Sequence, residues 1–322
     1  MRELLAQAPT LICLQEVTPR TLPTIQSLLG GRYLDVEGAG FPIPNRVCFT
    51  KMFLLHAAGL TVRDFSRRAF DAGSGMGRDL LLATLSSSKG IRVCVATSHL
   101  ESLASNVDLR QLQLTESLQR IETCSHQQGA DLFLLVGDLN VSSNDEPRLK
   151  NLTNPPHGWT DALASLPKNV TWDARTNKRV QVMTRKNNFG CRFDRCFFKI
   201  RGGQGSQVQG DRGWIFRGGS LVGTSTHFDQ LQHGHASDHY GIGLVWEHPS
   251  AFGYSLGDGK NSGSGGTGHV LGGGDGEAST ASRGREAQDG KSNVGRGGGR
   301  TMEDERQMRL MAAQVCRCSK LS

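Results

Sequence analysis

The amino-acid sequence predicts an α/β fold in which β-sheets pack against each other and helices cover them on the outside. Short apolar or β-branched runs alternate with turn residues over most of the chain, as is typical of sheet proteins. Only one long stretch has the spacing of an amphipathic helix. Many strands, few helices and long loops together favour packed sheets flanked by helices.

The predicted elements follow the apolar runs in order. Strands are expected at Leu11 to Val17, Val47 to Leu55, Leu80 to Leu85, Ile91 to Thr97, Leu132 to Gly137, Arg192 to Lys199 and Tyr240 to Val245. The long helix is expected from Ser105, as its N-cap, to about His126, because apolar residues recur there every three or four positions. Shorter helices are expected before Leu11 and over Leu22 to Leu29.

Glycine divides the chain into a folded part and a tail. The protein has 322 residues and 41 glycines, and glycine, serine and charged residues dominate the sequence after residue 250. Such a composition buries too little apolar surface to offset the entropy of ordering it. We therefore expect one domain over residues 1–249 and a disordered glycine-rich tail over 250–322, with a short helix at 302–315. The run GRGGGR at 295–300 is interpreted as linker in preference to a nucleic-acid-binding tail.

Charge and cysteine content narrow the functional classes. The formal net charge is +7 and the pI is about 9.1, which suits an anionic partner such as nucleic acid or a phosphorylated substrate. The 8 cysteines form no CxxC pair, so we expect a reducing compartment and neither a zinc site nor a disulfide framework. The sequence has no run of about 18 apolar residues, so no membrane-spanning helix is expected.

Polar residues that directly follow apolar strands are the candidate functional residues. Glu16 closes the first strand, and its carboxylate is a ligand suited to Mg²⁺, with a surface salt bridge as the alternative. His99 ends a later strand, where the alternative is a structural histidine. Asp238 precedes His239 at the start of the last strand, and we expect it to orient the imidazole and favour its charged form.

The run LFLLVGDLN at 132–140 gives the clearest signal. Gly137 permits close backbone approach, and Asp138 and Asn140 point to the same side of the strand. A carboxylate beside a carboxamide can hold a water molecule and a phosphoryl oxygen, although an Asx turn is an equal alternative. Taken together, the four strand ends supply a metal carboxylate, a base for water and a cationic donor, which are the groups that phosphodiester hydrolysis needs.

Six motifs resemble, in order, those of the endonuclease/exonuclease/phosphatase superfamily of Mg²⁺-dependent phosphodiesterases. They are LQEV at 14–17, TSHLES at 97–102, GDLN at 137–140, TWD at 171–173, RFDRCFF at 192–198 and SDHYG at 237–241. Within the superfamily they are most similar to the 5′-tyrosyl-DNA phosphodiesterases. The resemblance implies a four-layer α/β sandwich of two mixed β-sheets flanked by helices.

The resemblance also implies a role for each motif residue. Glu16 would hold Mg²⁺, with Mn²⁺ as an alternative ion, Asp138 would activate the attacking water, and Asn140 would position water or phosphate. His239 would donate to the scissile phosphate, and His99 would be a second histidine in contact with it.

Further residues are expected to bind the substrate. Trp172 and Phe193 resemble aromatic residues that line the path of the DNA end, with core packing as an equal alternative, and Arg78 is assigned to substrate binding. Asp194 is equally consistent with a structural role. The implied partner is a single-stranded DNA 5′ end that carries a topoisomerase-derived tyrosine or peptide. The protein is expected to be a monomer without a membrane partner, located in the nucleus, with the cytoplasm as a second location.

Two departures from the family pattern are expected to matter. The family has a strand ending in Trp-Asn well before the glutamate, whereas Glu16 has only fifteen residues before it. The sheet is therefore expected to lack its first strand and an active-site asparagine, and its exposed positions should be destabilising. The arginine that follows GDxN in the family is also missing, and Arg148 is the candidate to replace its phosphate contact.

Two other functions stay open at the level of sequence. Another superfamily nuclease, such as an endonuclease or a deadenylase, would share the metal chemistry. An inactive DNA-binding remnant would have lost that chemistry together with the first strand.

Overall fold

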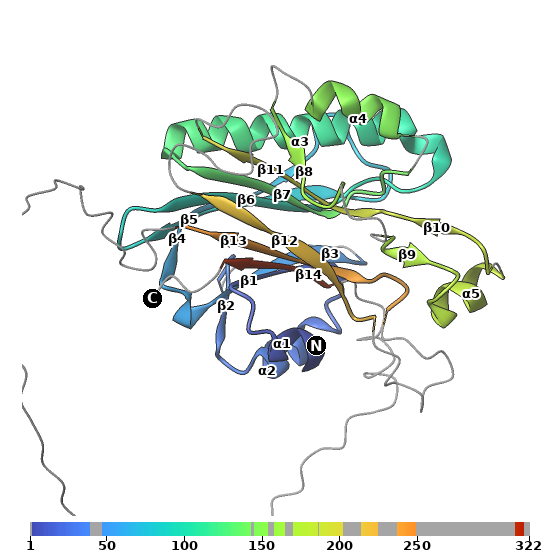
Figure 1. Cartoon of the computed structure of the whole chain (residues 1–322), viewed down its shortest axis with the longest axis horizontal. Coiled ribbons are helices and arrows are strands. Elements are labelled where there is room, and N and C mark those ends of the chain that lie inside the picture. Colours follow the sequence, from blue (N-terminus) through green and yellow to red (C-terminus); the bar gives the residue numbers. More distant parts are fainter. Residues whose placement is uncertain are drawn as a thin grey trace, which may run out of the picture. The chain divides into compact units, whose positions relative to one another are not determined.

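Two mixed six-stranded β-sheets form the framework of the structure, which is a computed structural model (Figure 1). The residues that the structure describes are 2–38, 47–142, 145–153, 158–164, 170–185, 187–201, 214–224, 237–248 and 313–318. Among them, no helix is both long enough and apolar enough to cross a membrane.

The first sheet has the strand order β12-β13-β14-β1-β3-β2, and the second has the order β4-β5-β6-β7-β11-β8. The strands of the first sheet are β1 (Leu11–Val17), β2 (Tyr33–Asp35), β3 (Phe49–Leu55), β12 (Ile215–Val222), β13 (Gly241–Glu247) and β14 (Ala313–Cys318). Those of the second sheet are β4 (Leu60–Ala69), β5 (Asp79–Ser87), β6 (Arg92–His99), β7 (Leu132–Asp138), β8 (Thr160–Asp161) and β11 (Asp194–Ile200). A separate ribbon pairs β9 (Trp172–Asp173) with β10 (Gly190–Cys191).

The helices lie outside the sheets (Figure 1). They are α1 (Arg2–Ala6), α2 (Leu22–Leu29), α3 (Val107–Gln128), α4 (Glu146–Thr153) and α5 (Lys178–Thr184), with 3-10 turns at His56–Ala58 and Ala104–Asn106.

Three apolar clusters separate four layers. Leu114 of α3 and Leu149 of α4 belong to the cluster that covers the outer face of the second sheet. Cys13 of β1 belongs to the cluster between the two sheets. Its neighbour Ile12 points to the other face, where it packs with Ile25 of α2, because side chains alternate along a strand. The order helix, sheet, sheet, helix confirms the predicted sandwich (Figure 1).

Most elements predicted from the sequence are present, and the errors have physical causes. β1 and α2 have their predicted bounds. The N-cap of α3 is Asn106 after a 3-10 turn, so Ser105 as N-cap is wrong. β4 has no counterpart among the predicted strands, because it lies at a sheet edge, is largely polar and exposed, and has a register shift between Val62 and Asp64 that breaks its alternation.

β14 corrects two predictions about the ends of the chain. It lies between β1 and β13, antiparallel to β1 and parallel to β13. Residues 313–315 are therefore strand, so the predicted helix over 302–315 is wrong there, and the rest of that range and of the tail lies outside the described residues. β1 has a partner on both sides, so its expected exposure beside a missing strand is also wrong. A segment distant in sequence pairs with the backbone groups of β1, which would be costly to leave unpaired.

A glycine at the centre of the second sheet permits a close backbone approach. Gly137 in β7 lies opposite Ser98 in β6, and a Cβ atom added at Gly137 would lie 1.9 Å from the backbone oxygen of Ser98. Gly137→Ala is therefore expected to lower the free energy of unfolding by about 1–3 kcal/mol or more, measured by urea denaturation.

Gly243→Ala is the control, because the atom nearest to its added Cβ is a side-chain methyl carbon of Val222 at 3.2 Å, which can move. An equal loss of stability in both variants would contradict the assignment of a specific backbone clash at position 137.

Candidate active site

The candidate active site begins with the register of three neighbouring strands. β6 and β7 run parallel with His99 opposite Asp138, and β7 and β11 run antiparallel with Asp138 opposite Asp194. The pairing of the backbone therefore places the three side chains in one row across the second sheet. All three are buried, so each is held by its neighbours.

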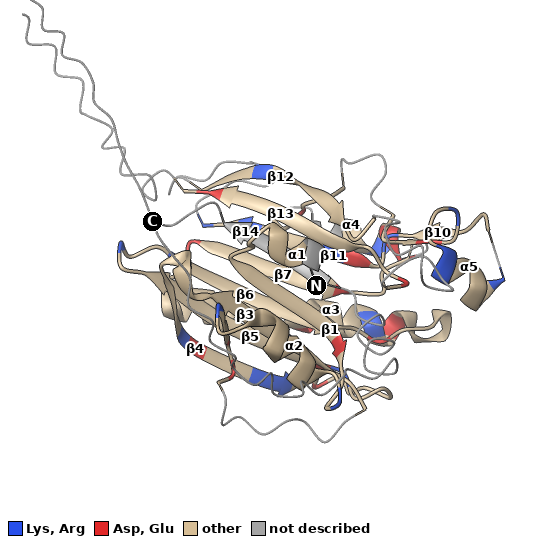
Figure 2. Cartoon of the chain, turned by 90° about the horizontal axis from the view of Figure 1, so that it is seen from below, with Lys and Arg blue, Asp and Glu red and all other residues tan. Residues whose placement is uncertain are grey.

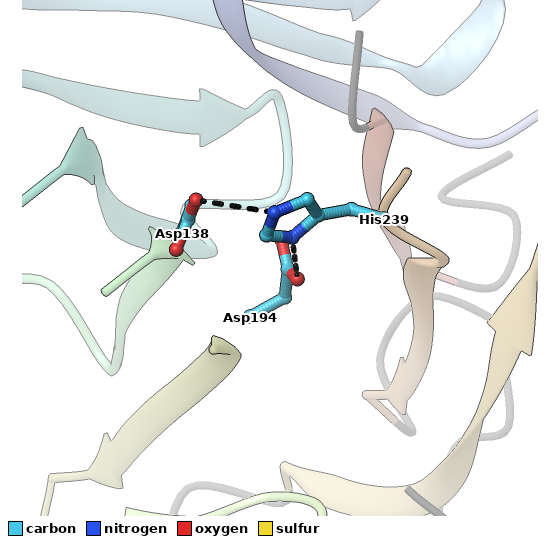
Figure 3. Close-up of side chains that lie close together, drawn as sticks. All are labelled: Asp138, Asp194 and His239. Atoms are coloured by element: carbon cyan, nitrogen blue, oxygen red, sulfur yellow. Dashed lines mark hydrogen bonds and ion pairs between the residues drawn. The ribbon is translucent and has the colours of Figure 1, made fainter. Parts of the chain in front are cut away.

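His239 approaches this row from the first sheet, just before β13 (Figure 3). Its Nδ1 lies 2.7 Å from Oδ2 of Asp194, and its Nε2 lies 3.9 Å from Oδ2 of Asp138. Burial by itself would lower the pKa of His239, but the negative charges of Asp194 and Asp138, with the hydrogen bond to Asp194, raise that pKa to about 10. His239 is therefore an imidazolium at neutral pH.

His99 has the opposite protonation state. Its Nδ1 accepts a hydrogen bond from Nη1 of Arg78 at 2.9 Å, so the ring proton is on Nε2, which faces Oδ2 of Asp138 at 3.3 Å. Burial is the main cause that lowers the pKa of His99 to about 4, and the positive charges of Arg78 and His239 act in the same direction. A neutral and a charged histidine thus face the same carboxylate.

The loop that carries Arg78 is tied down by a buried carboxylate. Glu101 is 1% exposed and accepts hydrogen bonds from the hydroxyl of Ser74 and the backbone N–H of Met76. The Ser74 hydroxyl in turn accepts from the backbone N–H of Arg78 at 2.7 Å. Arg110 donates to the backbone oxygen of Glu101. Arg78 therefore reaches His99 from a loop with defined contacts.

Glu16 lies at an irregularity near the end of β1. The register of β1 against β3 shifts between Leu14 and Val17, and Glu16 has a φ of 55°, in the left-handed region. Its side chain is 45% exposed, and its Oε1 lies 3.8 Å from Nδ1 of His99. Partial burial raises the pKa of Glu16, and the negative charges of Asp138 and Asp238 raise it further.

Asn140 closes the strand end next to Asp138. It has a φ of 51°, its backbone N–H donates to Oδ1 of Asp138 at 3.1 Å, and its Nδ2 donates to the backbone oxygen of Leu100 at 3.0 Å. The Asx turn that stood as an alternative is therefore present, and it fixes one oxygen of Asp138. Its amide oxygen is a further acceptor beside this turn.

Asp238 does not hold the His239 ring as predicted. The carboxylate bonded to Nδ1 is that of Asp194, because β11 pairs with β7 and brings Asp194 beside Asp138. Asp238 acts through its charge, which is the weakest of the causes that raise the pKa of His239. Arg148 also does not take the expected place at a phosphate, since it forms an ion pair with Asp108.

A row of aromatic rings leads away from His239. The ring centroid of Phe193 is 6.2 Å from that of His239, Trp172 is 5.9 Å from Phe193, and Phe189 is 5.6 Å from Trp172. Trp172 and Phe193 are half-buried, and Phe189 is 40% exposed. We call these three the aromatic row. Their rings are accessible in part, so core packing alone does not account for them.

α5 lies between β9 and β10 in the chain. The three rings of the aromatic row lie in or next to these two strands. α5 begins with Lys178 and Arg179, seen in blue in Figure 2. Asn177 caps the helix by accepting from the backbone N–H groups of Arg179 and Val180, and its Nδ2 donates to the backbone oxygens of Ser237 and Asp238. The cap therefore links the basic helix to the loop of His239.

The donor set is suited to a hard divalent cation. Glu16 lies close enough to Asp138 and Asp238 for their charges to raise its pKa, and a cation would relieve this repulsion. Ligand atoms of Asp138, Asp194 and His239 also lie within 4.8 Å of one another. A protonated imidazole cannot bind a metal, so the carboxylates at Glu16 fit a cation better than the group around His239.

Sequence reasoning missed several residues of the site. Asp194 stayed open between a functional and a structural role, Glu101 lies in the TSHLES motif but was given no role, and Phe189 was not singled out. Glu16, Arg78 and His99 share one small pocket. A larger pocket lies between β4, β5 and α3, away from these groups.

Two curated proteins are similar to this chain in sequence. No protein-family model matches the chain. It is 29% identical over 198 residues to tyrosyl-DNA phosphodiesterase 2 of Gallus gallus, which covers 60% of this chain and 48% of the relative, and 32% identical over 130 residues to that of Danio rerio, which covers 38% and 32%. The chain thus spans about half of one relative and a third of the other.

Solved structures show the same fold. The structure of D. rerio TDP2 with a single-stranded DNA product has a TM-score of 0.56 and 24% identity, and covers 74% of this chain and 86% of that one. An endonuclease/exonuclease/phosphatase family protein from Bacteroides thetaiotaomicron has a TM-score of 0.52 and 11% identity, and covers 74% and 83%. The chain therefore has the fold of these solved structures. The curated proteins that it resembles in sequence are tyrosyl-DNA phosphodiesterases 2.

The charge state of His239 depends on Asp194. Since the folded pKa of His239 is raised, the ring should stay protonated through neutral pH and lose its proton only near pH 10. In Asp194→Asn this midpoint should move to lower pH, because the main charge that opposes desolvation is removed. NMR of the histidine rings across a pH series measures the midpoint in the unmodified protein and in the variant.

Asp108→Asn, which removes an exposed carboxylate from a distant ion pair, should leave the midpoint unchanged. A midpoint that is the same in Asp194→Asn and in the unmodified protein would show that Asp194 does not set the charge of His239.

Proposed function

We propose that the protein is a divalent-metal-dependent phosphodiesterase that hydrolyses the bond between a DNA 5′-phosphate and a tyrosine derived from a topoisomerase. The observation that carries the proposal is the position of Asp138, whose Oδ2 lies between a charged and a neutral imidazole. Similarity to tyrosyl-DNA phosphodiesterase 2 supports the choice of substrate. The nucleus is the proposed location, because the substrate is DNA.

In the proposed reaction, Asp138 accepts the proton of the attacking water. The backbone N–H of Asn140 holds its Oδ1, so Oδ2 is the atom that receives the proton. His99, held by Arg78, places its Nε2 at 3.3 Å from the same oxygen and in the proposed reaction helps to keep the carboxylate in one orientation. A carboxylate constrained in this way can orient water for in-line attack on phosphorus.

His239 stabilises the negative charge that grows on the phosphate. Its Nδ1 proton is held by Asp194, which leaves the Nε2 proton free to point at a phosphate oxygen in place of the distant Asp138. A cation bound at Glu16 would supply positive charge to the nonbridging oxygens. The tyrosine phenolate, with a pKa of about 10, leaves without a strong general acid.

The aromatic row suits the bases of a single-stranded DNA end. Phe193, Trp172 and Phe189 extend from His239, and successive bases stack on such rings. Lys178 and Arg179 at the start of α5 provide positive charge for the phosphate backbone (Figure 2). A partly exposed row of aromatic rings, linked in the chain to a helix that begins with two basic residues, favours a nucleic-acid substrate over a small phosphate ester.

Replacing the proposed base tests the reaction. Asp138→Asn is expected to lower kcat by about 10²–10⁴-fold, because the carboxamide cannot accept a proton. The assay is Mg²⁺-dependent release of tyrosine from a 5′-phosphotyrosyl oligonucleotide, with chelator as the metal-free reference. Asp71→Asn, at a carboxylate that is 87% exposed, is the matched control and should keep full activity.

Unchanged turnover in Asp138→Asn would reject the assigned role. Preferred cleavage of an abasic duplex or of poly(A) by the unmodified protein would instead identify another superfamily nuclease, and no hydrolysis of any of these substrates would identify an inactive DNA-binding remnant.

The aromatic row should contribute to substrate binding. Trp172→Ala is expected to raise KM for a single-stranded tyrosyl substrate, because the variant loses about 1–3 kcal/mol of stacking free energy with a base. The change in kcat should be smaller. Trp172→Phe should retain most of the affinity, since it keeps an aromatic face. Equal KM values for the alanine variant and the unmodified protein would show that bases do not stack on Trp172.

A further inference from the structure

A gap in the first sheet is filled by the end of the chain. β14 pairs with Leu11 to Leu14 of β1 on one side and with Gly243 to Trp246 of β13 on the other (Figure 1). Since neighbouring strands lie about 4.8 Å apart, β1 and β13 without β14 would face each other across about 9.6 Å. This is too far for them to pair with each other.

The strands along this gap carry buried side chains. Ile12 and Cys13 of β1 point to opposite faces of the sheet and are fully buried, and Ile242 and Leu244 of β13 are fully buried on the face between the two sheets. Two rows of N–H and C=O groups would therefore be left unpaired in a largely apolar setting, at a cost for each group. The gap is a site that selects a β-strand.

We propose that this gap is a strand-binding groove and that its occupant is the chain's own segment Ala313–Cys318. The docking of this segment holds Glu16, at the end of β1, and His239, before β13, in register with each other. β14 pairs with β1 up to Leu14, two residues before Glu16, and with β13, which begins two residues after His239. Ala313 lies opposite Leu14, so the first residue of β14 is at the end of the sheet that carries Glu16. The proposal does not depend on the proposed enzymatic activity.

A long stretch of sequence connects β14 to its neighbour β13. β13 ends at Glu247 and β14 begins at Ala313, so residues 248–312 form the tether between them. The entropy of closing a loop grows slowly with length, and a covalent tether gives an effective concentration on the order of mM. Docking within one chain is therefore favoured over docking between chains.

Hydrogen exchange on the full chain tests the groove. Val315→Pro removes a backbone N–H at the centre of β14 and should weaken its pairing. Alternate amides of β1 point toward β14 and toward β3. In Val315→Pro, the amides of β1 and β13 that face β14 should exchange at least about tenfold faster than in the unmodified protein. The amides of β6 and β7 in the other sheet should keep their protection.

Ala281→Pro is the matched control, because it lies in the glycine-rich sequence before β14 and should leave exchange unchanged. Val315→Gly, a milder change, is used if the proline variant does not fold. Addition of a synthetic peptide of residues 309–322 should restore protection in β1 and β13 of the variant.

Two outcomes would overturn the proposal. Unchanged exchange of β1 and β13 in both Val315 variants would show that residues 313–318 do not occupy the groove. A dimer in light scattering, with β1 protection that falls on dilution, would show that the strand comes from a second copy. Loss of hydrolysis without altered exchange would concern the proposed function alone.

Discussion

The site depends above all on the alignment of β6, β7 and β11 at the end of the second sheet. Parallel pairing of β6 with β7 sets His99 opposite Asp138, and antiparallel pairing of β7 with β11 sets Asp194 opposite Asp138. Gly137 allows β7 to approach β6 at the residue before Asp138. A slip of one residue in any of these strands would turn the side chain to the opposite face.

Two histidines take opposite charge states beside one carboxylate because their other partners differ. His239 has Asp194 at its second nitrogen, which outweighs desolvation and keeps the ring charged. His99 has Arg78 at its second nitrogen, which adds to desolvation and keeps the ring neutral. The same residue type is thus a charged imidazole on one side of Asp138 and a neutral imidazole on the other.

Two strand ends of the candidate site also carry backbone strain. Glu16 and Asn140 both have positive φ, a conformation that costs a residue other than glycine about 1–2 kcal/mol. The strand pairing on either side holds Glu16 in place, and hydrogen bonds to Asp138 and Leu100 hold Asn140. Such strain persists where surrounding structure over-determines the geometry, and here it aims two polar side chains away from their strands.

The sequence alone determined the sandwich of sheets and most strands, because buried strands read as apolar runs and the family motifs lie at their ends. It also singled out Glu16, Asp138 and His239 as candidates, from their positions at the ends of such runs and from the resemblance of their motifs to a known family. It did not determine which carboxylate holds His239 or what fills the place beside β1. Adjacent residues along a strand point to opposite faces, so Asp238 was the wrong partner, and only pairing between distant strands brought in Asp194 and β14.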